Sequence, residues 1–350
     1  MARRGTGRAR ARRSFAAVLA TTTLALGALV ACGNQGGSGG GGGLAGNAAC
    51  DDYPAKEVRY IVPFSAGGGS AAWAESMKPV LAKKLGVDVK VEYLPGGGGI
   101  RGANEIRSAK PDGHTFGLMI INDVALADLL GHAQFDVTDL TMLARLTLDP
   151  QVFYAPASSD VDDIEELAAK SQREPIRHTG EEVSAIEVIT YHIFGVKWKF
   201  ILQEGKPETL LALRRGDADV SVGSLSSVLD ALKDGQMKPI LYEGPELSED
   251  TPGFEYVEDA PKVEDFGHPE LATDLVQQRI MVAPPGLPEC VETKLSQAMA
   301  DTLQDPEFLE LANKAGLNVD YADGKAVRDL LDKTLAVYDK YEDVLKAAIE

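Results

Sequence analysis

The chain has 350 residues, of which 44% are hydrophobic and 25% charged, and its formal net charge is −18. This acidic balance argues against a nucleic-acid-binding protein, because phosphates require a basic footprint. After the N-terminal segment, about 300 residues remain, which suit two domains of ordinary size.

The N-terminus has the pattern of an export signal. Residues 1–31 contain six arginines and no acid, and residues 15–30 are apolar. A basic head and a short apolar core predict a secretory signal peptide over residues 1–31, too short for a stable membrane span. The quartet Leu29-Val30-Ala31-Cys32 resembles a bacterial lipobox, which implies that Cys32 is lipidated and becomes the mature N-terminus. Arg12-Arg13 weakly resembles a twin-arginine signal, so export before or after folding stays open.

The segment that follows is rich in glycine. Its composition cannot bury a core and predicts a flexible tether over residues 32–49. A lipid anchor followed by a tether predicts a protein held on the outer face of the cell membrane, outside the cytoplasm. Processing at Cys32 would leave 29 basic and 53 acidic residues.

The chain has three cysteines. With Cys32 assigned to the lipid, Cys50 and Cys290 are the only possible pair, and an oxidising compartment permits a disulfide between them. We expect this disulfide, whose geometry the sequence cannot test.

Strands and helices alternate along the chain, which is typical of a doubly wound α/β fold. The predicted strands are 57–64, 87–93, 116–121, 198–202, 220–222, 239–242 and 279–283. The predicted helices are 71–85, 102–109, 162–170, 184–194, 207–215, 224–233, 288–303, 306–315 and 325–349. Residues 141–155 are expected to be extended, 177–180 to form a turn, and 244–270 to form a long surface crossover.

Two glycine runs, at residues 67–69 and 96–99, each follow a strand and precede a helix. Glycine lets the backbone approach a ligand closely, and the helix start offers free N–H groups and partial positive charge. Either run alone could be a plain turn. Two in succession favour a ligand cleft at the carboxyl ends of parallel strands.

Several other chemistries are not supported. Residues 97–102 match the G-x-G-x-x-G fingerprint, but residues 116–121, where the acid about 20 residues later would be expected, are wholly apolar. The five histidines show no metal-ligand spacing, and no G-x-S-x-G elbow exists. His178 is the only histidine beside a proposed ligand loop, where it could line the cleft. Glu165-Glu166 and Glu181-Glu182 are interpreted as solvated helix faces. We therefore expect no metal, no cofactor and no enzymatic activity.

Five stretches together carry a family likeness. They are residues 62–70, 94–103, 110–115, 215–220 and 283–288. In order and spacing they resemble the Bug-type extracytoplasmic receptors of tripartite tricarboxylate transporters, across essentially the whole mature chain.

The resemblance implies a two-domain periplasmic-binding-protein clamshell, type II-like, with mostly parallel doubly wound sheets. Domain 1 would comprise residues 50–150 plus 277–350, and domain 2 residues 151–276. The implied function is capture of a small carboxylate or polar solute and its delivery to the membrane permease subunits of the transporter, with the receptor a monomer. The alternatives are a receptor for an ABC importer or a sensor kinase, or an exported enzyme that uses the same cleft.

The resemblance also implies a set of ligand-binding residues. Backbone N–H groups would come from Ser65, Ala66, Gly67, Gly68, Ser70, Gly97 and Gly98. Thr179, Ser184 and Ser224 would face them, although each hydroxyl could equally be a helix N-cap. Arg101 would hold a carboxylate in bidentate fashion or lie exposed to solvent.

The chain also departs from the family pattern. Ala71 and Gly223 replace acidic residues, Ile100 replaces an asparagine, and Gln203-Glu204 replaces an aromatic–basic pair. The loss of two acids favours an anionic or polar ligand and argues against one that bears an amine.

Overall fold

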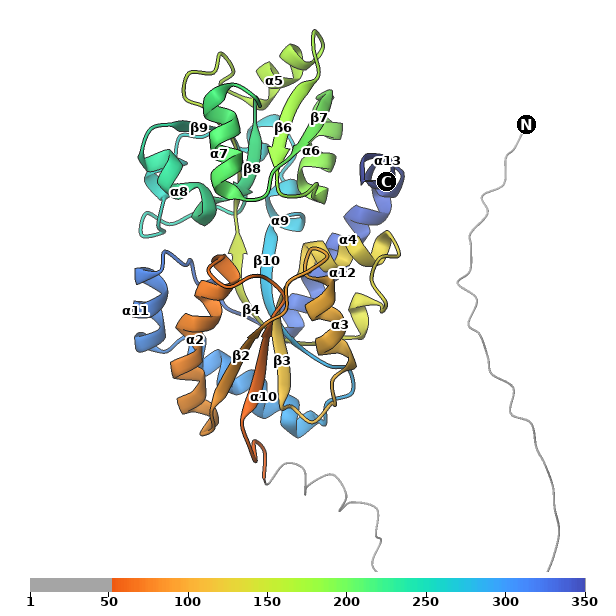
Figure 1. The fold of residues 1–350 in the computed structure, drawn as a ribbon, viewed down its shortest axis with the longest axis vertical. Coiled ribbons are helices and arrows are strands. Elements are labelled where there is room, and N and C mark those ends of the chain that lie inside the picture. The colour runs from red at the N-terminus through yellow and green to blue at the C-terminus, as the bar shows by residue number, and fades with distance from the viewer. Residues whose placement is uncertain (1–51, 350) are drawn as a thin grey trace, which may run out of the picture. The chain divides into compact units, whose positions relative to one another are not determined.

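The computed structural model describes residues 52–349 (Figure 1). The predicted signal peptide, Cys32, the tether and Cys50 lie outside the described residues. Within the described range, no helix is long and apolar enough to cross a membrane.

A six-stranded sheet has the order β11-β4-β10-β3-β1-β2. Its strands in chain order are β1 (Val58–Val62), β2 (Val89–Tyr93), β3 (Thr115–Ile120), β4 (Thr141–Asp149), β10 (Gln277–Ala283) and β11 (Ala322–Asp323). β1 is parallel to β2 and β3, whereas β10 is antiparallel to β3 and β4. β1, β2, β3 and β4 therefore share one direction.

The second group of strands lies in the middle of the sequence. It comprises β5 (Gln151–Pro156), β6 (Ile176–Gly180), β7 (Trp198–Leu202), β8 (Ser221–Ser224) and β9 (Met237–Glu243). β8-β5-β9 form one sheet and β6-β7 another, and a parallel bridge between His178 and Val220 links them. Only β5 runs against the others. The predicted α/β class with mostly parallel strand directions is confirmed.

The strands at the centre of the six-stranded sheet are buried on both faces. All six residues of β3 are buried, as expected for a strand covered on both sides. Along β1, Tyr60 and Val62 pack into one apolar cluster and Ile61 into the other, because successive side chains point to opposite faces.

Helices cover both faces of this sheet. α2 (Gly69–Leu85), α10 (Glu289–Leu303) and α11 (Pro306–Lys314) contribute to the cluster that contains Tyr60. α3 (Ile100–Ser108), α4 (Ile121–Leu129) and α12 (Gly324–Lys340) contribute to the cluster that contains Ile61. Trp73, on α2, is 2% exposed and packs against Phe308, so it belongs to the core.

The remaining helices are α5 (Ile164–Ser171), α6 (Ala185–Phe194), α7 (Lys206–Arg215), α8 (Leu225–Lys233), α9 (Leu271–Asp274) and α13 (Glu342–Ile349). α10 carries Cys290, which is disulfide-bonded. Because Cys50 lies outside the described residues, its pairing with Cys290 stays a prediction.

Three sequence expectations were wrong. Residues 177–180 are part of strand β6 rather than a turn, because their backbone pairs with β7. The helix α4 was not predicted, since the apolar run of β3 continues into it without a glycine or proline break. The 244–270 segment is not wholly on the surface: Val257 and Val263 are buried, and short 3₁₀ helices span Phe254–Tyr256 and Val263–Phe266.

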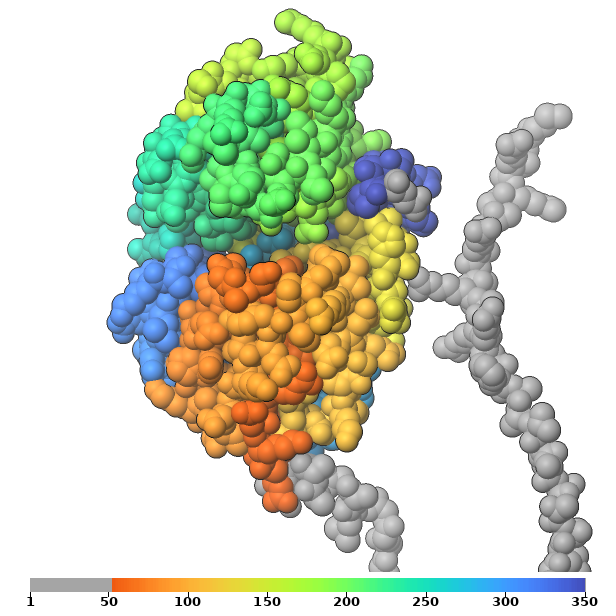
Figure 2. All heavy atoms as spheres, viewed as in Figure 1, coloured from red at the N-terminus to blue at the C-terminus, as the bar shows by residue number. Residues whose placement is uncertain are grey.

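The chain passes between the two groups of strands where β4 leads through Pro150 into β5, and again where it enters β10. The division into two domains at 150/151 and 276/277 stays a prediction. On the face shown in Figure 2, the orange surface of the first glycine-loop region meets the green surface of the middle segment along a hollowed line.

Candidate ligand-binding cleft

A cleft of about 670 Å³ is lined by residues from both groups of strands. It lies where β1, β3, β6 and β8 end, and the helices that follow begin at its walls. Lining residues stand at or beside the first residue of six helices: Gly69 for α2, Gly99 for α3, Asn122 for α4, Ser184 for α6, Lys206 for α7 and Ser224 for α8. Helix starts present unpaired N–H groups and partial positive charge, so this wall suits an anion.

The first glycine loop lies between β1 and α2. Ser65, Gly68 and Ser70 line the cleft, whereas Ala66 and Gly67 belong to the same loop but do not line it. Gly68 is the N-cap of α2, and the first turn of this helix contains no acidic side chain. The positive end of α2 is therefore not neutralised by its own residues.

The second glycine loop lies between β2 and α3. Gly96, Gly97, Gly98 and Gly99 all have positive φ, which L-residues with a Cβ rarely adopt. Gly98 lines the cleft and Gly97 does not.

The two loops are held together by a close approach at Gly102. A Cβ built on Gly102 would lie 2.5 Å from the Cβ of Pro63, so only glycine allows α3 to pack against the end of β1. Arg101 is exposed, donates from Nη1 to the Pro95 carbonyl at 3.4 Å, and does not line the cleft.

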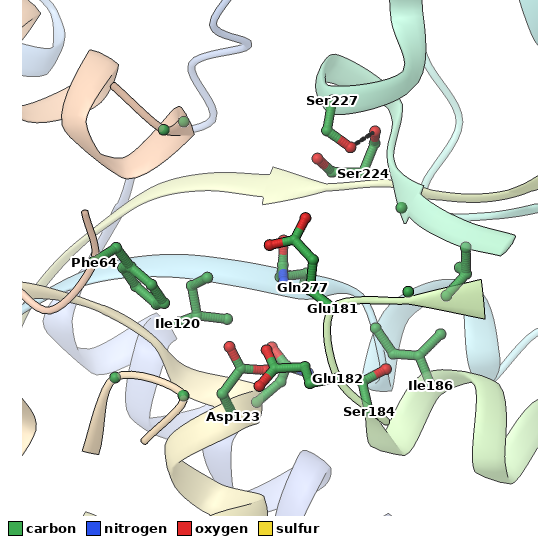
Figure 3. Close-up of a pocket in the computed structure, with 18 of the residues that line it drawn as sticks. Phe64, Ile120, Asp123, Glu181, Glu182, Ser184, Ile186, Ser224, Ser227 and Gln277 are labelled. Carbon is green, nitrogen blue, oxygen red and sulfur yellow. Dashed lines mark hydrogen bonds between the residues drawn. The ribbon is translucent and has the colours of Figure 1, made fainter. Parts of the chain in front are cut away.

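Of the three hydroxyl residues predicted to face the glycine loops, two line the cleft and one does not. Thr179 is fully buried, donates its hydroxyl to the Ile201 carbonyl at 3.0 Å, and does not line the cleft. Ser224 lines the cleft, and its carbonyl accepts a hydrogen bond from Ser227 Oγ at 2.8 Å (Figure 3). Ser184 lines the cleft and is also the N-cap of α6.

Ser184 and Glu187 form a capping box. The Ser184 N–H donates to Glu187 Oε1 at 2.6 Å, and the Ser184 hydroxyl donates to Glu187 Oε2. We expect Ser184→Ala to lower the free energy of unfolding by about 0.5–2 kcal/mol, because the cap is lost. Urea denaturation measures the change. Ser158→Ala, at an exposed position, is the matched control and should stay within about 0.5 kcal/mol of wild type; equal effects of the two variants would refute the capping role.

Sequence reasoning missed one buried basic residue, Arg279, whereas His178 was expected beside a ligand loop and does line the cleft. Arg279, on β10, is 8% exposed, lines the cleft and forms an ion pair with Asp149, which is 4% exposed. Burial lowers the pKa of Arg279 to about 10, while the charge of Asp123 acts in the opposite direction, so the guanidinium stays charged at neutral pH. His178 is 1% exposed, and burial lowers its pKa to about 3, so its ring is neutral. The sequence signal that could have identified Arg279 is its position inside the apolar run of β10.

Acidic side chains also line the cleft. Burial raises the pKa of Asp123 and, with the charge of Glu182, keeps it well above its usual range. Burial raises the pKa of Glu187 to about 7. The prediction that Glu181 and Glu182 lie on a solvated helix face was wrong. Both residues precede the first residue of α6 and line the cleft. In the described part of the chain, no group of three His, Cys, Asp or Glu residues could hold a metal ion.

A model of the tripartite tricarboxylate transporter family receptor matches residues 74–340. The chain belongs to this family. Among its relatives, a UPF0065 protein of Bordetella pertussis is 24% identical over 288 residues, covering 78% of this chain and 84% of the relative. Receptors of this family are extracytoplasmic solute-binding proteins.

Solved structures confirm the periplasmic-binding-protein fold. The periplasmic binding protein BugD is 21% identical, with a TM-score of 0.68, over 83% of this chain and 98% of BugD. MatC from Rhodopseudomonas palustris, solved with bound malate, is 22% identical with a TM-score of 0.67, over 84% of this chain and all of MatC.

Proposed function

We propose that this receptor captures a small carboxylate in the cleft and delivers it to the permease subunits of a tripartite transporter. The observation that carries the proposal is the meeting of two glycine loops, each at the start of a helix, with the starts of α6 and α8 across one cleft. Such helix starts bind anions through backbone N–H groups. The malate bound by MatC supports a solute of dicarboxylate size.

In this proposal, Gly68, Ser70 and Gly98 present backbone N–H groups to the carboxylate, and Ser224 faces them. The two domains, 50–150 plus 277–350 and 151–276, would close on the solute by bending at Pro150 and at the start of β10. The solute is bound without being chemically changed. Cys32 would carry a lipid that holds the monomeric receptor at the outer face of the membrane, with residues 33–49 as the tether.

The experiment is a thermal-shift screen of the purified protein against mono-, di- and tricarboxylates. A ligand that binds only the folded state stabilises it by about 2.7 kcal/mol at a hundred times its dissociation constant. We expect at least one carboxylate-bearing solute to raise the melting temperature, and solutes of the same size that lack a carboxylate to have no effect. A shift only by solutes that lack a carboxylate would refute the proposal.

Gly98→Val should weaken binding of the carboxylate found in this screen by at least about tenfold. At Gly98 φ is +59°, and an added Cβ would lie 3.1 Å from Glu182 Oε2, so the side chain strains the loop and fills the cleft. Gly131→Val is the matched control, because Gly131 also has positive φ (+72°) but has open space around it and lies outside the cleft. Titration calorimetry on both variants measures the affinities; equal losses would mean that backbone strain alone, and not the cleft, explains the effect.

A further inference from the structure

The cleft contains more acidic side chains than a site for a simple carboxylate needs. Its acidic residues are Asp123, Glu181, Glu182, Glu187 and Glu204, and its basic residues are Lys206 and Arg279. Arg279 is already paired with Asp149, and Glu187 is engaged in the capping box of α6. A dianionic solute would therefore meet carboxyl groups that either repel it or must stay protonated while it binds.

Two of these acids face each other across the cleft. Asp123 stands in the first turn of α4, and Glu182 in the turn between β6 and α6, so they come from the two different groups of strands. Their carboxyl groups point toward one another (Figure 3), and the charge of Glu182 raises the pKa of Asp123. Within residues 52–349, neither carboxyl accepts a hydrogen bond. Two carboxyl groups that face each other favour a proton or a bound cation, because each negative charge disfavours ionisation of the other.

A second, independent feature points to the other end of a ligand. Arg279 is more than nine-tenths buried, and its Nε has no hydrogen-bond partner in the described chain. Its Nη2 lies 3.6 Å from the position that a Cβ on Gly69 would occupy, so the guanidinium adjoins the start of α2. Arg279 pairs with Asp149 through Nη1, but its unpartnered Nε leaves a charged donor beside the positive end of α2, which favours a carboxylate at this place.

We propose that the solute is zwitterionic, with a protonated nitrogen between Asp123 and Glu182 and a carboxylate at Arg279 and the α2 loop. This inference rests on the proposed function and names its solute class. It replaces the sequence expectation against an amine, which relied on the loss of acids at Ala71 and Gly223. The structure supplies other acids to the same cleft, from segments that the family pattern did not single out.

The test compares matched pairs of solutes with and without the amine, by titration calorimetry on the purified protein. Glutamate is paired with glutarate, γ-aminobutyrate with butyrate, and 5-aminovalerate with valerate. We expect at least one amine-bearing member to bind about tenfold or more tightly than its partner. Asp123→Asn and Glu182→Gln should each remove most of this preference, measured as the ratio of the two affinities. Glu258→Gln and Asp259→Asn, at exposed acids outside the cleft, are the matched controls.

The pH dependence gives a second readout. The groups that face Asp123 are Glu182 from the turn before α6, Glu187 from α6, Arg279 from β10 and Tyr338 from α12. The pKa values of Asp123 and Glu182 are raised, so the empty cleft holds protons that a cationic nitrogen must displace. The affinity for the amine-bearing solute should therefore rise from pH 5.5 to pH 8, and affinity for its partner should not.

The outcomes separate the two proposals. If solutes without the amine bind as tightly as their partners, or if the preference survives in Asp123→Asn and Glu182→Gln, the zwitterion inference is overturned and the carboxylate function stands. If no carboxylate of either kind binds, the proposed function fails as well. An amine preference that is lost in both cleft variants and kept in both controls supports the inference.

Discussion

Replacing Asp149 with alanine is expected to lower the free energy of unfolding by about 3–5 kcal/mol. Asp149 and Arg279 pair on neighbouring strands β4 and β10, and their side chains are only 5% and 10% exposed. Removing the acid leaves a buried guanidinium whose desolvation is no longer offset by its partner.

Urea denaturation at pH 7 measures this effect. The double variant Asp149→Leu with Arg279→Met should regain most of the lost stability, since a buried ion pair can be replaced by apolar residues of similar size. The double variant should nevertheless bind carboxylates more weakly than wild type, because Arg279 lines the cleft. A single variant within about 1 kcal/mol of wild type would show that Arg279 does not depend on Asp149.

Glu243→Gln is expected to stabilise the protein at pH 8 and to leave it unchanged at pH 4. Glu243, at the end of β9, is 1% exposed, and Thr190 Oγ1 donates to its two oxygens at 3.1 and 3.2 Å. Burial raises the pKa of Glu243 from 4.5 to about 8, with the hydrogen bond from Thr190 acting in the opposite direction. Glutamine resembles the protonated acid, so it removes the cost of a buried carboxyl that titrates.

Proton linkage gives the direction in which Glu243 changes the free energy of unfolding with pH. Below pH 4.5 the carboxyl is protonated in both the folded and the unfolded state, so it contributes nothing. Between pH 4.5 and 8 the unfolded state loses the proton that the folded state keeps, and stability falls as pH rises. The difference at pH 8 should be a few kcal/mol and at most about 5. Denaturation series at both pH values, with Glu258→Gln as the exposed control, measure it; a stabilisation of the same size at pH 4 would contradict the assignment.

The strongly patterned parts of this protein could be predicted from the sequence. The strand, glycine run and helix at residues 57–85 appear as expected, because the apolar run of β1 suits a buried strand and the glycines after it separate it from α2. The second glycine run at 96–99, with four positive φ values, likewise separates β2 from α3. The loops that line the cleft could be placed for the same reason.

The charged residues of the cleft could not be predicted in this way. Asp123 follows a run of apolar residues in which no turn is visible, and Arg279 lies inside an apolar strand. They come together because β10 lies between β3 and β4 in the sheet. This pairing joins residues that are far apart in the sequence, so local patterns do not reveal it. Thr179 was misplaced because the residues around it form a strand, where its hydroxyl bonds to the neighbouring strand β7.

The most direct test of the central claim is an NMR titration of the glycine-labelled protein with the carboxylate identified by the thermal screen. We predict that the amide signals of Gly68, Gly69 and Gly98 shift with increasing solute, because their N–H groups face the carboxylate. The amides of Gly131 and Gly235, outside the cleft, should not move. Saturable shifts elsewhere, with the two glycine loops unchanged, would contradict a carboxylate site formed by these loops.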